Sequence, residues 1–422
     1  MNSTVGSSRE RREAVLRAAF RGWGKSYYSN TSMATVAEEL GVSKAALYRH
    51  VDGKADLVEA MEALYLEAFV SLVVEPLERE APRGLQRFVK SYFERLLDFY
   101  GGQPEYYVFL VAHVLREEIL AKEPFRRVVA WHQRLLEERL QAERVLEVEE
   151  VGRYLTLFGI FWLIEVHRRE GEEAAACYQF LGLDLPESSK ERGRLVAGAA
   201  DVCINGFVRG PRISEEEMAR VERLAWVERE EMLEPDRIFS AIEQVVAEEG
   251  LAEATVEKIA RRIGMTKSSL YFYFRNKDDM FGKAVEREKG HLSRLIEGRI
   301  RFLDGTSEKL YALKVMAASY TVNNPTQLTV INWLRYRNVR VQAPRRVLDR
   351  MQEALEFIPA ARSRGDIKAP RGSVGAVALF PNFLVTREIL SGGMTRFSRE
   401  ELVAALRRLY LLFEQGVAAY TE

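Results

Sequence analysis

The chain has 422 residues, of which 47% are hydrophobic and 29% are charged, and its 62 basic and 62 acidic side chains give a formal net charge of zero. This composition is typical of a soluble, intracellular, helical protein with at least two domains. It argues against a generally basic protein that binds any polyanion. The two cysteines, Cys177 and Cys203, match neither a disulfide framework nor a metal-binding pattern, so we expect two buried free thiols.

Residues 8–57 predict a unit of three helices. A first helix is expected from Arg11 to Ser26. A short second helix ends at Gly41, because glycine takes the left-handed backbone region of a tight turn without steric cost. Ser43 then has the right side chain to cap a third helix. The helical spacing predicts a buried side formed by Val36, Leu40, Val42 and Leu47.

Residues 58–210 predict a longer helical region. Its most apolar run, Tyr154 to Ile164, has 11 residues, whereas a membrane-spanning helix needs about 20. We therefore expect a core or interface helix and no membrane partner, and the polar start of the chain favours a cytoplasmic protein. Three histidines with no compact metal-ligand spacing are expected to be surface or singly hydrogen-bonded residues, without a metal: His113, His132 and His167.

Residues 211–234 predict a helical linker between two halves. Gly210 and Pro211 end the first half, and Ser214 with Glu217 predicts a capping box that opens a helix. We expect this helix to continue to Glu234, where a proline follows. About 18 helical residues at 1.5 Å each would span roughly 27 Å.

Residues 235–280 repeat the first unit without a gap, at a constant offset of 223 positions. Leu40-Gly-Val-Ser-Lys-Ala-Ala-Leu-Tyr48 recurs as Ile263-Gly-Met-Thr-Lys-Ser-Ser-Leu-Tyr271. Residues 281–422 then predict a second helical region. Each half ends in a capped amphipathic helix, from Ser188 to Val208 and from Ser398 to Tyr420.

Both repeats resemble the DNA-binding domain of TetR-type transcriptional regulators, whose pattern is a capping Thr, Ile-Ala, Gly-Val-Ser, Leu-Tyr-x-x-Phe and Lys. The first copy matches with Ser32, Val36-Ala37, Gly41-Val42-Ser43, Leu47-Tyr48 and Lys54, and the second with Thr255, Ile259-Ala260, Gly264-Met265-Thr266, Leu270-Tyr271 and Lys277. The resemblance implies an all-α fold of two tandem units. Each would have a helix-turn-helix domain followed by a helical ligand-binding and dimerisation domain.

In the family, the last two helices of each subunit form a four-helix dimer interface. Transferred to this chain, helices near 151–169 and 190–208 would pack on helices near 373–390 and 399–420, which gives an internal pseudo-dimer. A covalent link would hold the two halves together at any dilution.

The resemblance also implies two sets of DNA-binding residues. Phosphates would be held by the capping hydroxyls, the tyrosines and the last lysine of each copy: Ser32, Tyr48 and Lys54, and Thr255, Tyr271 and Lys277. Bases would be read by Ser43, Lys44, Ala45, Arg49 and His50 in the first copy, and by Thr266, Lys267, Ser268, Phe272 and Tyr273 in the second.

We call the helix-turn-helix segment that carries each set of base-contacting residues a reader. The two readers differ in side chains and in charge. Residues 258–277 carry a net charge of +6, whereas the matching residues 35–54 have none. Because phosphate neutralisation supplies most sequence-independent affinity, the acidic residues Glu38, Glu39 and Asp52 make a loss of DNA binding credible for the first unit. Unlike readers need not recognise a palindrome, so we expect an asymmetric operator.

The function indicated is a DNA-binding transcriptional regulator, with repression through a small apolar or aromatic effector as the family default. Aromatic residues that are candidates for an effector pocket, most of them expected to be ordinary core, are Tyr92, Phe93, Tyr106, Phe109, Trp131, Trp162, Tyr311, Tyr320, Trp333 and Tyr336. The alternative is a helical ligand- or protein-binding scaffold in which one or both units no longer bind DNA. Catalytic motifs and cofactor-binding motifs are absent from the sequence, so we expect no enzyme and no cofactor.

Overall fold

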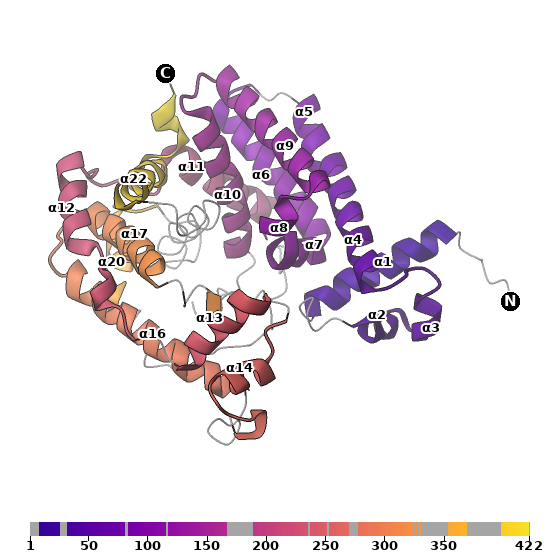
Figure 1. The fold of residues 1–422 in the computed structure, drawn as a ribbon. Coiled ribbons are helices and arrows are strands. Elements are labelled where there is room, and N and C mark those ends of the chain that lie inside the picture. The colour runs from indigo at the N-terminus through magenta and orange to yellow at the C-terminus, as the bar shows by residue number, and fades with distance from the viewer. Residues whose placement is uncertain are drawn as a thin grey trace. The chain divides into compact units, whose positions relative to one another are not determined.

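The computed structural model describes residues 8–25, 32–80, 83–114, 117–166, 189–234, 237–250, 253–269, 277–324, 326, 329–330, 353–368 and 398–421. In these ranges every regular element is a helix, accompanied by two isolated antiparallel bridges (Figure 1). The predicted all-α class is confirmed. The chain separates into a first compact unit, residues 1–81, 94–135 and 334–338, and a second, residues 82–93, 136–333 and 339–422.

The first compact unit begins with the predicted three-helix arrangement. Helices α1 (Ser8–Lys25), α2 (Met33–Leu40) and α3 (Lys44–Leu47) are followed by α4 (Lys54–Phe69). Helix α1 packs on α2 and α4 through an apolar face that includes the fully buried Ala18 and Phe20. Short helices such as α2 and α3 are marginal alone in water, so this packing accounts for their presence.

Beyond α4, the first compact unit contains two π-helical segments. Helix α4 continues into η1 (Val70–Val74) and α5 (Glu75–Arg79), and α7 (Pro104–Phe109) continues into η2 (Leu110–Val114). The other helices with residues in this unit are α6 (Leu85–Gly102), α8 (Glu117–Leu120) and α9 (Glu123–Ala142), of which α6 and α9 also contribute residues to the second unit.

The core of this unit is aromatic and extends into the three-helix arrangement. Tyr65 on α4 lies against Phe109, with ring centroids 5.6 Å apart, and Phe69 lies against Phe99 at 5.5 Å. Phe20 of α1 joins the cluster at 5.1 Å from Phe109. The three-helix arrangement and the helices after it therefore share one core.

The second compact unit contains most of the remaining helices. They are α10 (Val148–Val166), α11 (Ser189–Asn205), α12 (Glu215–Ala225), η4 (Arg229–Glu231), α13 (Arg237–Glu249), α14 (Val256–Arg262), α16 (Lys277–Ile300), α17 (Thr306–Asn323), α20 (Phe357–Arg364), α22 (Arg399–Gln415) and η5 (Val417–Tyr420). Helix α22 begins with the predicted Ser398–Glu401 capping box. The predicted capping residue Ser188 lies outside the described residues.

The linker helix α12 is shorter than expected. Its predicted capping box is confirmed, since Ser214 and Glu217 satisfy each other's backbone amides. The helix ends at Ala225 and does not reach Glu234 as predicted. The reason is tertiary, because the Val227 amide donates to Ser319 Oγ at 3.0 Å and its carbonyl accepts from Asn323 Nδ2 at 2.7 Å. These bonds to α17 hold the chain extended after the helix.

The C-terminal ends of the two halves pack on each other within the second compact unit. Helices α10 and α11 both contact α22, and the rings of Phe207 and Phe413 stack with centroids 4.5 Å apart. Two antiparallel bridges join the halves, Val145 to Thr421 and Val208 to Ile367. The predicted partner segment 373–390 lies outside the described residues.

Several expectations about buried residues need correction. Val42 is 43% exposed, because it lies in the turn after Gly41 and not on a helix face. His113 and His132 are buried and not on the surface, but His113 fits the other alternative, a hydrogen-bonded histidine, because its Nε2 lies 2.7 Å from Glu62 Oε1. Cys203 is a buried free thiol as expected, but Cys177 and His167 lie outside the described residues. Within the described ranges, no helix is long and apolar enough to span a membrane.

Candidate nucleic-acid interface

The first helix-turn-helix is built by the caps and the glycine that its sequence predicted. Ser32 Oγ accepts from the Thr35 amide at 3.1 Å, and Ser43 Oγ accepts from the Ala46 amide at 3.2 Å. Gly41 has a φ of 66°, in the left-handed region where other residues are strained. These features set the direction in which α3 leaves the turn.

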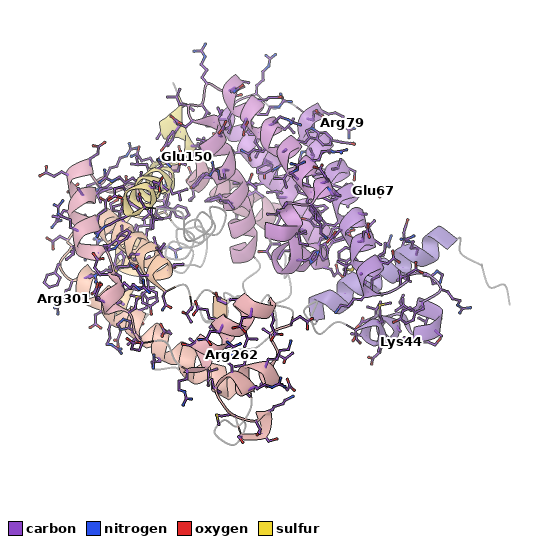
Figure 2. The ribbon with its side chains drawn as sticks, in the orientation of Figure 1. Lys44, Glu67, Arg79, Glu150, Arg262 and Arg301 are labelled. Atoms are coloured by element: carbon purple, nitrogen blue, oxygen red, sulfur yellow. The ribbon has the colours of Figure 1, made fainter. Side chains whose placement is uncertain are left out.

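The predicted DNA-contacting residues of the first domain lie together at and after α3. Lys44, Ala45, Tyr48 and Arg49 are exposed, and His50 is half-buried. Helix α3 is a single turn, and the Tyr48 amide still donates to the Lys44 carbonyl at 3.1 Å. Lys54 is the first residue of α4, and partial burial lowers the pKa of its ammonium group. Figure 2 marks Lys44 in this group.

The second helix-turn-helix has the same local construction. Thr255 Oγ1 accepts from the Lys258 amide at 3.3 Å, and Thr266 Oγ1 accepts from the Ser269 amide at 3.0 Å. Gly264 has a φ of 75°. Lys267 and Ser268 are exposed at the start of the next helix. Tyr271, Phe272 and Tyr273 lie outside the described residues, as does the side chain of Lys277.

Ion pairs at the second helix-turn-helix were not expected from the sequence. Arg262 Nη1 donates to Glu248 Oε1 at 2.7 Å, and a second bond joins the same two groups. Lys258 pairs with Glu249, and Lys267 pairs with Glu257. Figure 2 marks Arg262 on this domain.

These pairs change the electrostatic comparison of the two domains. The window of net charge +6 excludes four glutamates that lie just before it. With them included, residues 248–277 carry a net charge of +2 and the matching residues 25–54 carry +1. The domains therefore differ in the arrangement of charge more than in its sum. The missed signal was acidic residues on α13, on the turn after it and in the first turn of α14, which pair with the basic residues when the domain folds.

The candidate effector aromatics are mainly core residues, as expected. Buried positions are taken by Tyr92, Phe93, Tyr106, Phe109, Tyr311 and Tyr320, and Trp131 is half-buried. The side chain of Trp162 and residues Trp333 and Tyr336 lie outside the described part of the chain.

A buried polar cluster in the first compact unit was also missed. His113 Nε2 lies 2.7 Å from Glu62 Oε1, and Lys122 Nζ donates to the same carboxylate at 2.9 Å. Desolvation raises the pKa of Glu62, but the hydrogen bonds from both partners outweigh it and lower the pKa. Glu62 lies on α4, the helix that begins at Lys54. Among the side chains that the structure describes, no His, Cys, Asp and Glu group could hold a metal ion.

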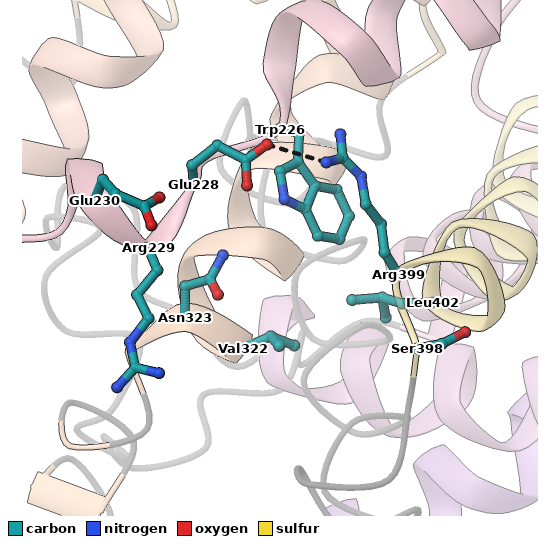
Figure 3. A pocket seen from close by; sticks show the side chains of 9 residues that line it. All are labelled: Trp226, Glu228, Arg229, Glu230, Val322, Asn323, Ser398, Arg399 and Leu402. Carbon is teal, nitrogen blue, oxygen red and sulfur yellow. Dashed lines mark hydrogen bonds and ion pairs between the residues drawn. The ribbon is translucent and has the colours of Figure 1, made fainter.

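A pocket of about 300 Å³ lies in the second compact unit, after the linker helix (Figure 3). Arg399 crosses it, with its guanidinium 4.3 Å from the Trp226 ring centroid and 3.0 Å from Glu228 Oε1. None of the candidate effector aromatics that the structure describes lines it. The lining residues are Trp226, Glu228, Arg229, Glu230, Val322, Asn323, Ser398, Arg399 and Leu402.

Comparison with known proteins finds the same duplication. The family of bacterial regulatory proteins called the tetR family matches residues 15–61 and again residues 238–284. The chain is 23% identical over 129 residues to the fatty acid metabolism regulator protein of Bacillus subtilis (strain 168). That similarity covers 31% of this chain and 66% of the relative, slightly less than two thirds of its length.

Solved structures give similarities at low identity. The fatty acid degradation regulator FadR from Bacillus halodurans is 20% identical with a TM-score of 0.33, over 43% of this chain and 96% of that one. The apo form of AibR is 18% identical with a TM-score of 0.32, over 38% and 89% of the two chains.

Proposed function

We propose that the chain is a DNA-binding transcriptional regulator and that both of its domains act in one molecule on an asymmetric operator. The two matches to the tetR family, at residues 15–61 and 238–284, support this proposal. In this proposal the two halves form an internal pseudo-dimer, so that no second chain is needed to pair the readers. The observation that carries the proposal is the reciprocal contact between the ends of the two halves.

That contact has the pattern of a two-fold interface. In such an interface each contact occurs twice, the second time with the roles of the two halves exchanged. Val145 of the first half bridges to Thr421 of the second, and Ile367 of the second bridges to Val208 of the first. Val145 and Ile367 each follow a helix at corresponding places in the two halves, at an offset of 222. Val208 lies shortly after α11, the last helix of the first half, and Thr421 follows α22 and the short η5 at the end of the second half.

The backbone hydrogen bonds repeat the pattern. Leu146 N donates to the Tyr420 carbonyl at 2.6 Å, and Lys368 N donates to the Phe207 carbonyl at 2.7 Å. Leu146 and Lys368 are again 222 positions apart. Such reciprocity is expected of two fused subunits, and it supports a pairing that is intramolecular.

The two half-sites of the operator should differ because the base-contacting residues of the two domains differ. The first domain would present Ser43, Lys44, Ala45, Arg49 and His50 to bases, and the second would present Thr266, Lys267, Ser268, Phe272 and Tyr273. A homodimer of identical readers selects a palindrome, because its symmetry is imposed on the operator. One chain with two different readers has no such symmetry.

We also propose that a small apolar effector controls the DNA affinity through the first compact unit. The aromatic cluster around Tyr65 and Phe109 includes Phe20 of α1, so a ligand that displaced these rings would act directly on the DNA-binding helices. The relative from Bacillus subtilis is named for fatty acid metabolism, which makes fatty acids and their thioesters the first compounds to test. A ligand shifts such an equilibrium only by its different affinity for the two states.

The proposal is tested by selecting bound duplexes from a random library with the full chain, with Tyr48→Ala and with Tyr271→Ala. A two-part site with unlike halves, weakened in both variants, is the expected result. Two identical half-sites would contradict the asymmetric operator. Loss of the site only with Tyr271→Ala would make the first domain structural, and no enriched site at all would favour the helical scaffold.

A companion measurement tests the intramolecular pairing. Sedimentation of the chain with its selected duplex should give one chain per site, down to nanomolar concentration, since the linker keeps the halves at high effective concentration. Two chains per site, with dissociation on dilution, would contradict the pseudo-dimer.

A further inference from the structure

Two equivalent lysines at the readers have unlike surroundings. Lys44 begins α3, and Lys267 begins the corresponding helix of the second domain, 223 positions later. The Lys267 ammonium is paired with the Glu257 carboxylate. The residue that corresponds to Glu257 in the first domain is Ala34, and the Lys44 ammonium instead lies 5.9 Å from the centroid of the Tyr48 ring.

The Lys267–Glu257 pair is one of three ion pairs on this domain. In the other two, Glu248 pairs with Arg262 and Glu249 pairs with Lys258. At the corresponding position of the first domain the charges of the Arg262–Glu248 pair are exchanged, since Glu39 and Lys25 stand there. Glu257 differs from Glu248 and Glu249 in the position of its partner. Lys267 lies in the helix that begins after the turn at Gly264, where base contacts are expected.

The Lys267 ammonium beside the Glu257 carboxylate favours the charged form of this group. The hydrogen bond from Lys267 is the main cause that lowers the pKa of this carboxyl. Glu257 and Lys267 are each 49% exposed, so both groups are available to a ligand. A lysine beside a carboxylate offers a donor and an acceptor together, whereas Lys44 offers a donor alone.

We propose that Glu257 is a specificity-determining residue of the second DNA-binding domain, which positions the Lys267 ammonium for base contact and opposes its use on phosphate. The inference rests on the proposed DNA-binding function. A carboxylate near the backbone of DNA repels phosphate, and sequence-independent affinity comes from phosphate neutralisation. In the major groove a lysine donates to guanine and a glutamate accepts from the amino group of cytosine. The pair therefore fits a guanine–cytosine base pair, and the first domain lacks the acceptor.

The test compares the full chain with Glu257→Gln, with the reciprocal variant Ala34→Glu and with the control Glu253→Gln. Glu253 lies in the same acidic segment, with its carboxylate 3.9 Å from Lys258, and its replacement removes the same charge without touching Lys267. Each protein is assayed on random duplex, on its selected site and on single-base variants of that site, over a range of salt concentrations.

We expect Glu257→Gln to bind random duplex about two- to fivefold more tightly and to lose its preference at one base pair of the second half-site. Ala34→Glu should have the opposite effect at the first half-site, and Glu253→Gln should change neither preference. Ala34 is exposed in the first turn of α2, where a carboxylate suits the helix dipole, so this variant should fold.

Equal preference and equal salt dependence in the wild type and in Glu257→Gln would overturn the inference. So would an identical change in the Glu253→Gln control, which would reduce the effect to net charge. If the wild-type chain selects no site, the failure lies with the proposed function. If it selects a two-part site that Glu257→Gln reads unchanged, only the role of Glu257 fails.

Discussion

Gly206 and Gly416 end equivalent helices, α11 and α22, and each lies against the backbone at the end of the other helix. Both have a positive φ, of 74° and 75°. A β-carbon at Gly206 would collide with the Glu414 carbonyl, and one at Gly416 would collide with the Ile204 carbonyl. The halves can approach this closely only because neither residue has a side chain.

Gly206→Ala and Gly416→Ala should therefore each lower the free energy of unfolding by about 2–4 kcal/mol, from backbone strain together with overpacking. Denaturant unfolding measures the change. Gly365→Ala is a matched control, because Gly365 also has a positive φ, of 84°, but has open space around its β-carbon position; its cost should be about 1–2 kcal/mol. Equal costs for all three variants would mean that the close approach contributes nothing.

The linker helix should behave as part of the second half and not as a free tether. Glu222 of α12 accepts from Arg407 Nε at 2.6 Å and Nη2 at 2.7 Å, and also from the Tyr311 hydroxyl at 2.6 Å. Glu222→Gln should lower the free energy of unfolding by about 1–3 kcal/mol, because Arg407 loses a charged acceptor. It should also speed amide exchange in α12.

The control for this change is Glu216→Gln, an exposed position on the same helix, where an effect within about 0.5 kcal/mol is expected. Hydrogen exchange of the α12 amides separates the two outcomes. If both variants leave α12 equally protected, the Glu222 bonds do not anchor the linker.

The features that could be predicted from the sequence are local. Ser43 caps the helix that begins next to it, and Gly41 makes the turn two residues earlier, so each depends on neighbours in the chain. Ser214 and Glu217 form their capping box for the same reason. The predicted fold class and the positions of the two helix-turn-helix segments follow from such signals, repeated at one spacing.

The features that could not be predicted depend on distant residues. Helix α12 ends at Ala225 because Val227 bonds to residues of α17 about 90 positions later. The Lys267–Glu257 pair forms across a turn and is invisible in a charge count that begins at residue 258. The π-helical segments η1 and η2 have no signature in hydrophobic spacing. For α12 and for the Lys267–Glu257 pair, a contact formed on folding decided the outcome that local preference left open.

Replacement of Lys314 by an apolar residue should stabilise the second half. Its ammonium nitrogen is buried with no hydrogen-bond partner among the described residues, 3.5 Å from the centroid of the Phe413 ring and 4.3 Å from that of Tyr410. Burial lowers the pKa of this amine, so the folded state opposes the charge that the unfolded chain carries.

Lys314→Met has a similar shape and no charge to bury, so we expect it to raise the free energy of unfolding at neutral pH by about 1–3 kcal/mol. The difference between the two proteins should shrink as the pH rises toward 10.5, the ordinary pKa of lysine, because the unfolded chain then loses the proton too. Destabilisation by Lys314→Met would mean that contact of the amine with the rings outweighs its burial.

His132 should make the first compact unit sensitive to mild acid. The imidazole is buried in the helical core with its ring centroid 5.7 Å from that of Phe69. Desolvation lowers its pKa from 6.5 to about 4. Below pH 6.5 the unfolded chain therefore binds a proton that the folded chain does not, and the free energy of unfolding falls as the pH decreases.

At about 1.4 kcal/mol for each pKa unit, the loss between pH 6.5 and pH 5 should be roughly 2 kcal/mol. His132→Phe should remove this part of the pH dependence, and the difference between the variant and the wild type isolates His132 from the other histidines. Glu62 does not interfere, because its pKa is lowered from 4.5 and its contribution is lost only below that pH. Thermal unfolding from pH 7 to pH 5 provides the measurement, and parallel curves for the two proteins would show that His132 is protonated in the folded state.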